Sequence, residues 1–208
     1  MQQAARWRSV RVAVLALFVC LFGFDPSATA TDTTDSCILW GESTPLTWDL
    51  FQAVPPADAV HRNEAAAIHM TIRWHAVYSV TSNGGSWTGH VKTATVTNAM
   101  EPALSWVVPG KAAPLVLRHE QGHFDLNEVY RRKLELSLAC LRAQSATKDG
   151  AIDTLNTALH NRANEILAQL QAAQARYDAE TGHGNNAAGQ VQWATLIARW
   201  LLDPAAAP

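Results

Sequence analysis

Between residues 68 and 80 the sequence reads Ile-His-Met-Thr-Ile-Arg-Trp-His-Ala-Val-Tyr-Ser-Val. Apolar side chains occupy every second position from Ile68 to Val80, and most positions between them carry polar groups. A period of two places one face of the chain in a core and the other toward solvent, which predicts a half-buried β-strand. Asn83-Gly84-Gly85 is a turn signal. The Val- and Thr-rich stretch 87–97 then predicts an antiparallel partner strand.

Shorter elements are expected on either side of this hairpin. Residues 103–108 predict a shorter strand, and residues 46–51 predict one short element before the loop at Pro55-Pro56. Three histidines fall on the polar side of the predicted strands, where we expect exposure rather than metal binding: His69, His75 and His90.

The second half of the chain has helical periodicity. Pro114 suits a helix start, and the pattern predicts a helix to about Ala146. After a break at Asp149-Gly150, apolar residues spaced by threes and fours predict a second helix that ends at Gly182. A third, shorter helix is expected around residues 191–200. Strands followed by helices predict an α+β fold, in which two long helices and a short C-terminal helix pack against a small antiparallel sheet.

The N-terminus has the pattern of a secretory signal peptide. Three arginines precede an apolar stretch over residues 12–24, and the small residues Ala28-Thr29-Ala30 follow. This pattern predicts cleavage after Ala30 and export to the periplasm or the extracellular space. The apolar stretch is shorter than the roughly 20 residues of a membrane span, so no stable span is expected after cleavage. A retained N-terminal anchor is the alternative.

Four regions are expected in the chain. They are a signal peptide over 1–30, a flexible segment over 31–43, a single domain over 44–202 and a disordered tail over 203–208. The formal net charge of −2 becomes −4 after cleavage, because three arginines and one aspartate leave. Such a charge gives no basis for nucleic-acid binding.

Export changes what the remaining cysteines are expected to do. Cys37 and Cys140 are the two cysteines left after cleavage, and an oxidising compartment would allow them to form a disulfide. Two buried thiols are the alternative.

The first predicted helix contains His119-Glu120-Gln121-Gly122-His123. Residues four apart lie one helical turn apart, so the two imidazoles share a face. Two neutral imidazoles suit Zn²⁺, and a catalytic site needs a third protein ligand and an open position for water. Glu120 is placed to take a proton from that water as general base.

The third ligand has to come from elsewhere in the chain, because Asp125 and Glu128 point away from the two histidines on an ideal helix. The end of the second helix should return toward His119, and there His183, flanked by glycines, is the first candidate. The alternatives are Asp178 and Glu180, with Glu165 a more distant one. Tyr130 or Tyr177 could stabilise an oxyanion by a hydrogen bond, although a buried core position is an equal expectation for each.

Several segments together are similar to a bacterial family of predicted secreted zinc-dependent proteases, catalogued as a domain of unknown function. The matching residues are Leu46-Thr47-Trp48, Phe51, Pro55-Pro56, Ser105-Trp106-Val107, Leu117 to Asp125, Tyr177-Asp178, Thr181, His183-Gly184, Gln190 and Trp193. The resemblance implies an exported zinc metallopeptidase with His119 and His123 as ligands and Glu120 as catalytic acid and base. It also places His183 in a matching segment.

Two functions follow as hypotheses. One is a zinc metallopeptidase of zincin-like plan that hydrolyses a peptide or protein substrate. The other is a non-catalytic zinc-bearing envelope protein that serves binding or structure. A structural zinc site would close its fourth position with a protein ligand and would not need a carboxylate beside the metal. Glu120 therefore favours the enzyme.

Overall fold

The computed structural model describes residues 3–4, 8–13, 37–62 and 64–208. The predicted cleavage site after Ala30, and most of the predicted signal peptide, lie outside the described residues.

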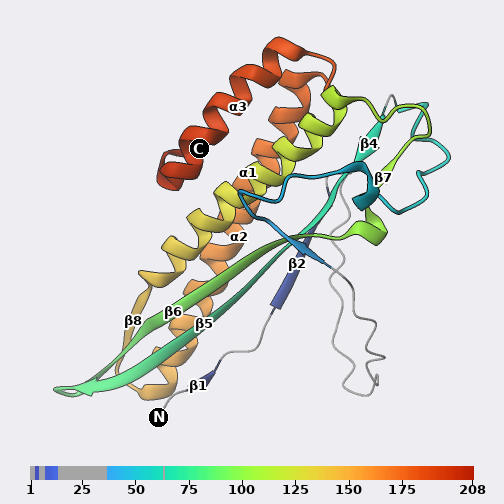
Figure 1. Cartoon of the computed structure of the whole chain (residues 1–208). Coiled ribbons are helices and arrows are strands. Elements are labelled where there is room, and N and C mark those ends of the chain that lie inside the picture. Colours follow the sequence, from blue (N-terminus) through green and yellow to red (C-terminus); the bar gives the residue numbers. More distant parts are fainter. Residues whose placement is uncertain (1–2, 5–7, 14–36, 63) are drawn as a thin grey trace, which may run out of the picture.

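A long antiparallel hairpin forms the centre of the sheet (Figure 1). Strand β5 (His69–Asn83) pairs with β6 (Ser86–Met100) from Met70 opposite Met100 to Asn83 opposite Ser86, with one irregularity between Val77 and Tyr78. The turn is closed by Gly84 and Gly85, which have φ angles of 58° and 95°. Positive φ at both positions matches the right-handed twist of the flanking strands and favours glycine. The strand predicted from the period of two and its Val- and Thr-rich antiparallel partner are both confirmed.

Short strands complete the sheet. The outer edge of β6 pairs with β3 (Ile38–Leu39) near one end and with β8 (Arg142–Ser145) near the other. The outer edge of β5 pairs with β1 (Gln3–Ala4) and β2 (Arg8–Ala13). A separate two-stranded sheet joins β4 (Ala66–Ala67) to β7 (Trp106–Val107).

The short element predicted over residues 46–51 is a 3-10 helix, Trp48–Leu50. The predicted strand 103–108 is reduced to the two residues of β7, because a 3-10 helix at Pro102–Leu104 precedes it. Pro102 lacks the N–H that a strand ladder needs and is favoured at the first turn of a helix.

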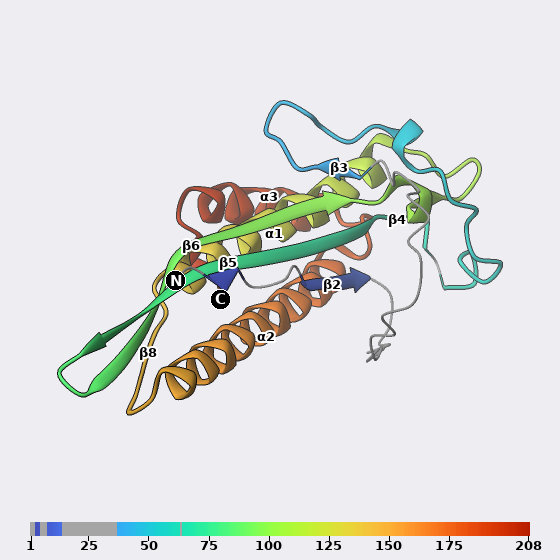
Figure 2. The ribbon, with the colours of Figure 1, turned by 90° about the horizontal axis from the view of Figure 1, so that it is seen from below.

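Two helices pack along one face of the hairpin, a third packs against those two, and together they confirm the α+β fold (Figures 1 and 2). They are α1 (Pro114–Ala139), α2 (Lys148–Thr181) and α3 (Ala187–Leu202). Side chains from alternate positions of β5 and from all three helices form the main hydrophobic cluster; it includes Ile72, Trp74, Tyr78, Leu126, Leu134, Leu159, Leu170 and Trp193. Among the described residues, none of the helices combines the length and the apolar character needed to cross a bilayer.

The boundary between α1 and α2 differs from the prediction. Helix α1 ends at Ala139 and not near Ala146, because residues 142–145 pair with β6 as β8. Asp149 and Gly150 do not break a helix; they lie in the first turn of α2. The cap is Thr147, whose side chain accepts a hydrogen bond from Gly150 N at 3.1 Å. A threonine cap of this kind satisfies one of the unpaired N–H groups at a helix start.

Two polar residues of α1 hold the segment that precedes the hairpin. The Asp125 carboxylate accepts hydrogen bonds from Trp40 Nε1 at 2.8 Å and from Gln121 Nε2 at 2.7 Å. Gln121 Oε1 in turn accepts from Leu46 N at 2.8 Å. The expectation that residues 31–43 are flexible is therefore wrong for the end of that segment, since Trp40 is fixed to α1 and Ile38 lies in β3.

The C-terminal tail is also ordered, which corrects the expectation of disorder over 203–208. Residues 204–206 form a 3-10 helix, and Ala207 is buried in the main cluster. Tyr130 donates its hydroxyl to Pro208 O at 2.8 Å, and Lys133 donates to Ala207 O at 2.7 Å. Polar side chains of α1 thus satisfy the carbonyls of a segment that composition alone marks as unstructured.

The disulfide expected between Cys37 and Cys140 is not formed. Cys37 adjoins Ile38, which pairs with Met100, whereas Leu141, next to Cys140, accepts a hydrogen bond from Val91 N at 3.1 Å. The nine residue steps along β6 from Val91 to Met100 span about 30 Å. A disulfide requires Cα atoms within about 7 Å, so this fold keeps the two thiols apart.

Replacement of Asp125 tests the attachment of the N-terminal segment. Asp125→Ala removes the acceptor of two hydrogen bonds and should lower the free energy of unfolding by about 1–3 kcal/mol. Asp125→Asn keeps an acceptor oxygen and should lower it by less. Urea denaturation of both variants measures the difference. Equal losses would show that the hydrogen bond to Trp40 does not stabilise the fold.

Candidate metal centre

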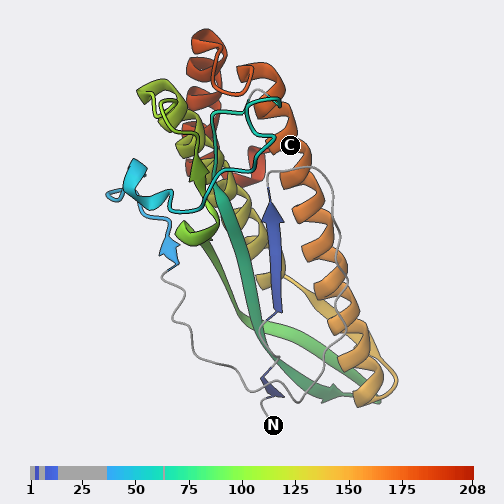
Figure 3. The same ribbon diagram turned by 90° about the vertical axis from the view of Figure 1, so that its right-hand side faces the viewer.

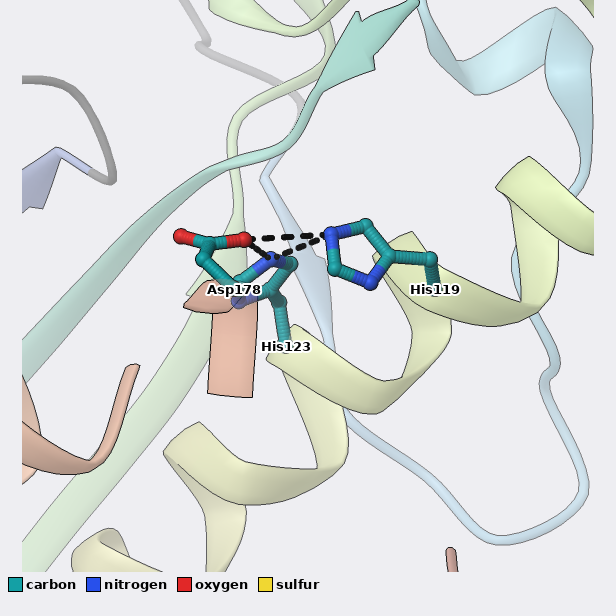
Figure 4. A group of neighbouring side chains, drawn as sticks. All are labelled: His119, His123 and Asp178. Carbon is teal, nitrogen blue, oxygen red and sulfur yellow. Dashed lines mark hydrogen bonds and ion pairs between the residues drawn. The ribbon is translucent and has the colours of Figure 1, made fainter. Parts of the chain in front are cut away.

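Three side chains from α1 and α2 meet at one point (Figure 4). His119 and His123 lie one turn apart on α1, and Asp178 lies in the last turn of α2. Asp178 Oδ1 is 3.1 Å from His119 Nε2 and 2.9 Å from His123 Nε2, and the two Nε2 atoms are 3.0 Å apart. Both histidines are buried, and Asp178 is partly buried. The pair of histidines predicted from the helical spacing is thus joined by a carboxylate.

The tautomer of His123 follows from its contact with Gln174. His123 Nδ1 lies 2.6 Å from Gln174 Oε1, while Gln174 Nε2 donates to the backbone carbonyl of His123 at 3.0 Å. An amide oxygen can only accept, so Nδ1 of His123 carries the proton. In the neutral imidazole, Nε2 then presents a lone pair to Asp178 and His119.

The same argument applies to His119. Its Nδ1 lies 3.3 Å from Thr181 Oγ1, and Thr181 donates its own hydroxyl hydrogen to Tyr177 O at 2.6 Å. Thr181 therefore accepts from His119 Nδ1, and the neutral ring again presents a lone pair at Nε2. The Tyr177 ring stacks on the His119 ring at a centroid distance of 4.8 Å and fixes its plane.

Three acceptor atoms consequently converge with no hydrogen between them when both imidazoles are neutral. Zn²⁺ binds imidazole nitrogen and carboxylate oxygen at about 2.0–2.2 Å, so neighbouring ligands of a tetrahedral site lie about 3.3 Å apart. The observed separations of 2.9–3.1 Å are close to that geometry. The residues therefore fit a divalent cation.

The protonation behaviour of the group agrees with this interpretation. Burial lowers the pKa of His119 to about 4. Burial also disfavours the charged form of His123, but the hydrogen bond and negative charge of Asp178 outweigh it and raise the pKa of His123. Burial opposes ionisation of Asp178, yet its close contacts with the two imidazoles hold its pKa well below the usual range. The site thus favours a positive charge beside Asp178.

Glu120 lies beside this group and faces the sheet. The side chain is buried, and Oε2 accepts a hydrogen bond at 3.0 Å from the N–H of Ile68, the residue before β5. Burial raises the pKa of Glu120 to about 7. A carboxyl group with a pKa near neutrality can both accept and return a proton, as a general base requires.

His183, the first candidate for the third ligand, lies at the edge of the site. Its Nδ1 is 3.5 Å from Asp178 Oδ1, and its side chain is 57% exposed. It is not one of the three residues whose ligand atoms lie within 4.8 Å of one another. The backbone at His183 has a φ of 50°, the one positive value at a non-glycine among the described residues.

The remaining candidates lie away from the metal position. Glu180 accepts from Arg176 Nε at 2.6 Å and from Trp193 Nε1 at 2.8 Å. Glu165 pairs with Arg162 on the exposed surface of α2. Tyr130 binds the C-terminal tail, as described above.

Tyr177 contacts the site through its ring, and its hydroxyl donates to His119 O at 3.2 Å, toward the backbone of α1. The three strand histidines are half-buried instead of exposed, and the metal group does not include them; they are His69, His75 and His90.

Sequence reasoning did not identify the residues that hold the ligands. Gln174 and Thr181 orient the two imidazoles, and Gly122 makes room for Tyr177. A Cβ at Gly122 would lie 2.1 Å from the Tyr177 hydroxyl oxygen. The sequence did contain a signal for Gln174 and Thr181, because positions 174, 178 and 181 share one face of a helix.

Replacement of Gln174 tests the orientation of His123. Gln174→Leu removes the acceptor that holds the proton on Nδ1 and should weaken zinc binding by about 10–100-fold, as loss of such supporting hydrogen bonds does in zinc sites. Gln174→Glu keeps an acceptor oxygen and should weaken binding less. Competition with a fluorescent chelator measures the affinity, and circular dichroism controls for folding. Unchanged affinity in Gln174→Leu would contradict the role.

Comparisons with known proteins identify a family and no function. A family model described as a bacterial protein of unknown function (DUF922) matches residues 48–184, which include the two histidines, Glu120 and Asp178. No curated protein and no solved structure matches the chain. The matched residues make up more than half of the sequence, and the chain belongs to the DUF922 family of bacterial proteins.

Proposed function

We propose that this protein is a zinc-dependent metallopeptidase. The observation that carries the proposal is the convergence of His119 Nε2, His123 Nε2 and Asp178 Oδ1, with the buried carboxyl of Glu120 in the next position of the same helix. Two imidazoles and one carboxylate form a ligand set typical of catalytic zinc, which leaves a position for water or substrate. The Asp178 carboxylate takes the place that sequence analysis gave first to His183.

Each part of the site has a chemical task in peptide hydrolysis. A bound Zn²⁺ would polarise the peptide carbonyl and lower the pKa of water. Glu120 takes a proton from the attacking water as the new C–O bond forms. It then delivers that proton to the leaving nitrogen as the C–N bond breaks. Ile68 N–H binds Oε2, so Oε1 is the oxygen that we assign to the proton transfer.

His183 is suited to contact the substrate. The residue follows Gly182 at the end of α2, and its N–H donates to Asp178 O at 3.0 Å, which holds the loop at the site. Its exposed imidazole lies beside Asp178 but outside the three ligands. We assign to it a hydrogen bond to the carbonyl oxygen on which negative charge develops. Such donors matter most in the transition state.

The proposal includes the compartment. The three arginines, the apolar stretch over 12–24 and Ala28-Thr29-Ala30 support export, so we propose that the mature enzyme works in the periplasm or outside the cell. Its substrate would be a peptide or protein.

Zinc content and activity together test the proposal. The wild type should hold about one zinc per chain. Asp178→Ala should lose most of it, whereas Glu120→Gln should keep the metal and cleave a mixed peptide library at least about 100-fold more slowly. Glu165→Gln, at an exposed glutamate of α2, is the matched control and should change neither property. Absence of stoichiometric zinc from the wild type would contradict the proposal.

His183→Ala separates a ligand from a substrate contact. If His183 binds the carbonyl oxygen, the variant should keep its zinc and lose about 100–1,000-fold in kcat, with a smaller change in KM. His183→Gln retains a donor and should recover part of the loss. Elemental analysis and steady-state kinetics on one peptide provide both quantities. Loss of zinc equal to that of Asp178→Ala would instead make His183 a metal ligand.

A further inference from the structure

We propose that the outer edge of β5 binds the substrate as an extended chain antiparallel to that strand, with the residues N-terminal to the cleaved bond along His69–Trp74. The inference rests on the proposed peptidase function and adds the mode of substrate binding to it. The occupant is a polypeptide in β-conformation, recognised mainly through its backbone.

The edge already carries such a segment in the structure. Strand β2 pairs antiparallel with β5 over six residue pairs, from Arg8 opposite Trp74 to Ala13 opposite His69. In Figure 3, β2 runs alongside β5 on the side away from β6. The ladder shows that the backbone groups on this edge of β5 are accessible to a second chain and that no other described strand covers residues 69–74.

The direction of that segment leads to the metal centre. Ala13, the last residue of β2, lies opposite His69. The residue before His69 is Ile68, whose N–H is bound by Glu120 Oε2 at 3.0 Å. A chain that continues in the direction of β2 therefore approaches the general base with its C-terminal end. A peptide seated in this way presents the bond to be cleaved just beyond the position of Ala13.

Signal cleavage would leave this edge open. Both segments that pair with the outer edge of β5, Gln3–Ala4 and Arg8–Ala13, belong to the predicted signal peptide. The outer edge of β6 would keep its partners after cleavage, because β3 and β8 come from the remainder of the chain. An open strand edge presents unpaired N–H and C=O groups, and an added strand satisfies them.

The chain from residue 31 onward has its own core. The three hydrophobic clusters are formed by residues between Ile38 and Ala207. The family match, residues 48–184, also begins well after the predicted cleavage site. A chain of residues 31–208 is therefore a suitable form for a binding experiment.

The test uses a synthetic peptide with the sequence of residues 6–16 and the chain 31–208 with Glu120→Gln, so that binding is measured without cleavage. Fluorescence anisotropy should show saturable binding, and hydrogen exchange should slow at amides within residues 69–74. The full-length Glu120→Gln chain, whose own residues 8–13 occupy the edge, should bind the peptide at least about tenfold more weakly.

Backbone methylation provides the matched control. One peptide carries N-methyl groups at positions 8, 10 and 12, and the other at positions 9, 11 and 13. Alternate N–H groups of a strand point toward the same neighbour, so one of the two peptides should lose at least about tenfold in affinity and the other much less. Equal loss in both peptides, protection of amides elsewhere, or equal affinity of the full-length chain would overturn the assignment.

The two proposals fail in different ways. Binding of the peptide to the edge does not require zinc or Glu120, so a chain without zinc or activity that still binds it would contradict only the peptidase. If the protein cleaves peptides with zinc but the peptide does not slow hydrogen exchange at the β5 amides, only the proposal of substrate binding at the β5 edge would be contradicted.

Discussion

The structure depends most on the meeting of three electron-pair acceptors between two helices. His119, His123 and Asp178 point their acceptor atoms at one place, with separations of 2.9–3.1 Å. Three acceptors without a hydrogen between them repel each other, and this repulsion is expensive in a buried site. A positive charge at that place removes the conflict. The arrangement of α1 and α2 at this end of the molecule is therefore most easily explained as a cation site.

The surrounding residues prevent the three side chains from moving apart to relieve this repulsion. Gln174 donates to the backbone carbonyl of His123, which holds its amide in place, and it accepts from the ring of His123, which cannot turn without breaking that hydrogen bond. Tyr177 stacks on His119 and reaches its carbonyl, and the absence of a side chain at Gly122 permits this close approach. The glycine of the motif thus serves the packing of α2 on α1. Support of this kind preorganises ligands for a metal.

Periodicity predicted the elements of the fold well, and tertiary contacts determined what it missed. The alternation in β5 and the helical spacing of α1 and α2 are local signals, and the structure confirms them. The end of α1 was predicted too late because β8 forms only when β6 is available as a partner. The ordered tail depends in the same way on Tyr130 and Lys133, which are more than 70 residues away in sequence.

In the candidate site, too, the local pattern was predictable from the sequence and the tertiary contact was not. The spacing of His119 and His123 follows from the geometry of one helix and was predictable. The third position required knowledge of where α2 ends: Gly182, with a φ of 56°, turns the chain out of the helix, so His183 leaves the face that meets α1. Asp178, one turn earlier, remains on that face with Gln174 and Thr181. Because the three candidate ligands come from two helices, a bound cation would hold α2 against α1, and metal binding and helix packing would stabilise each other.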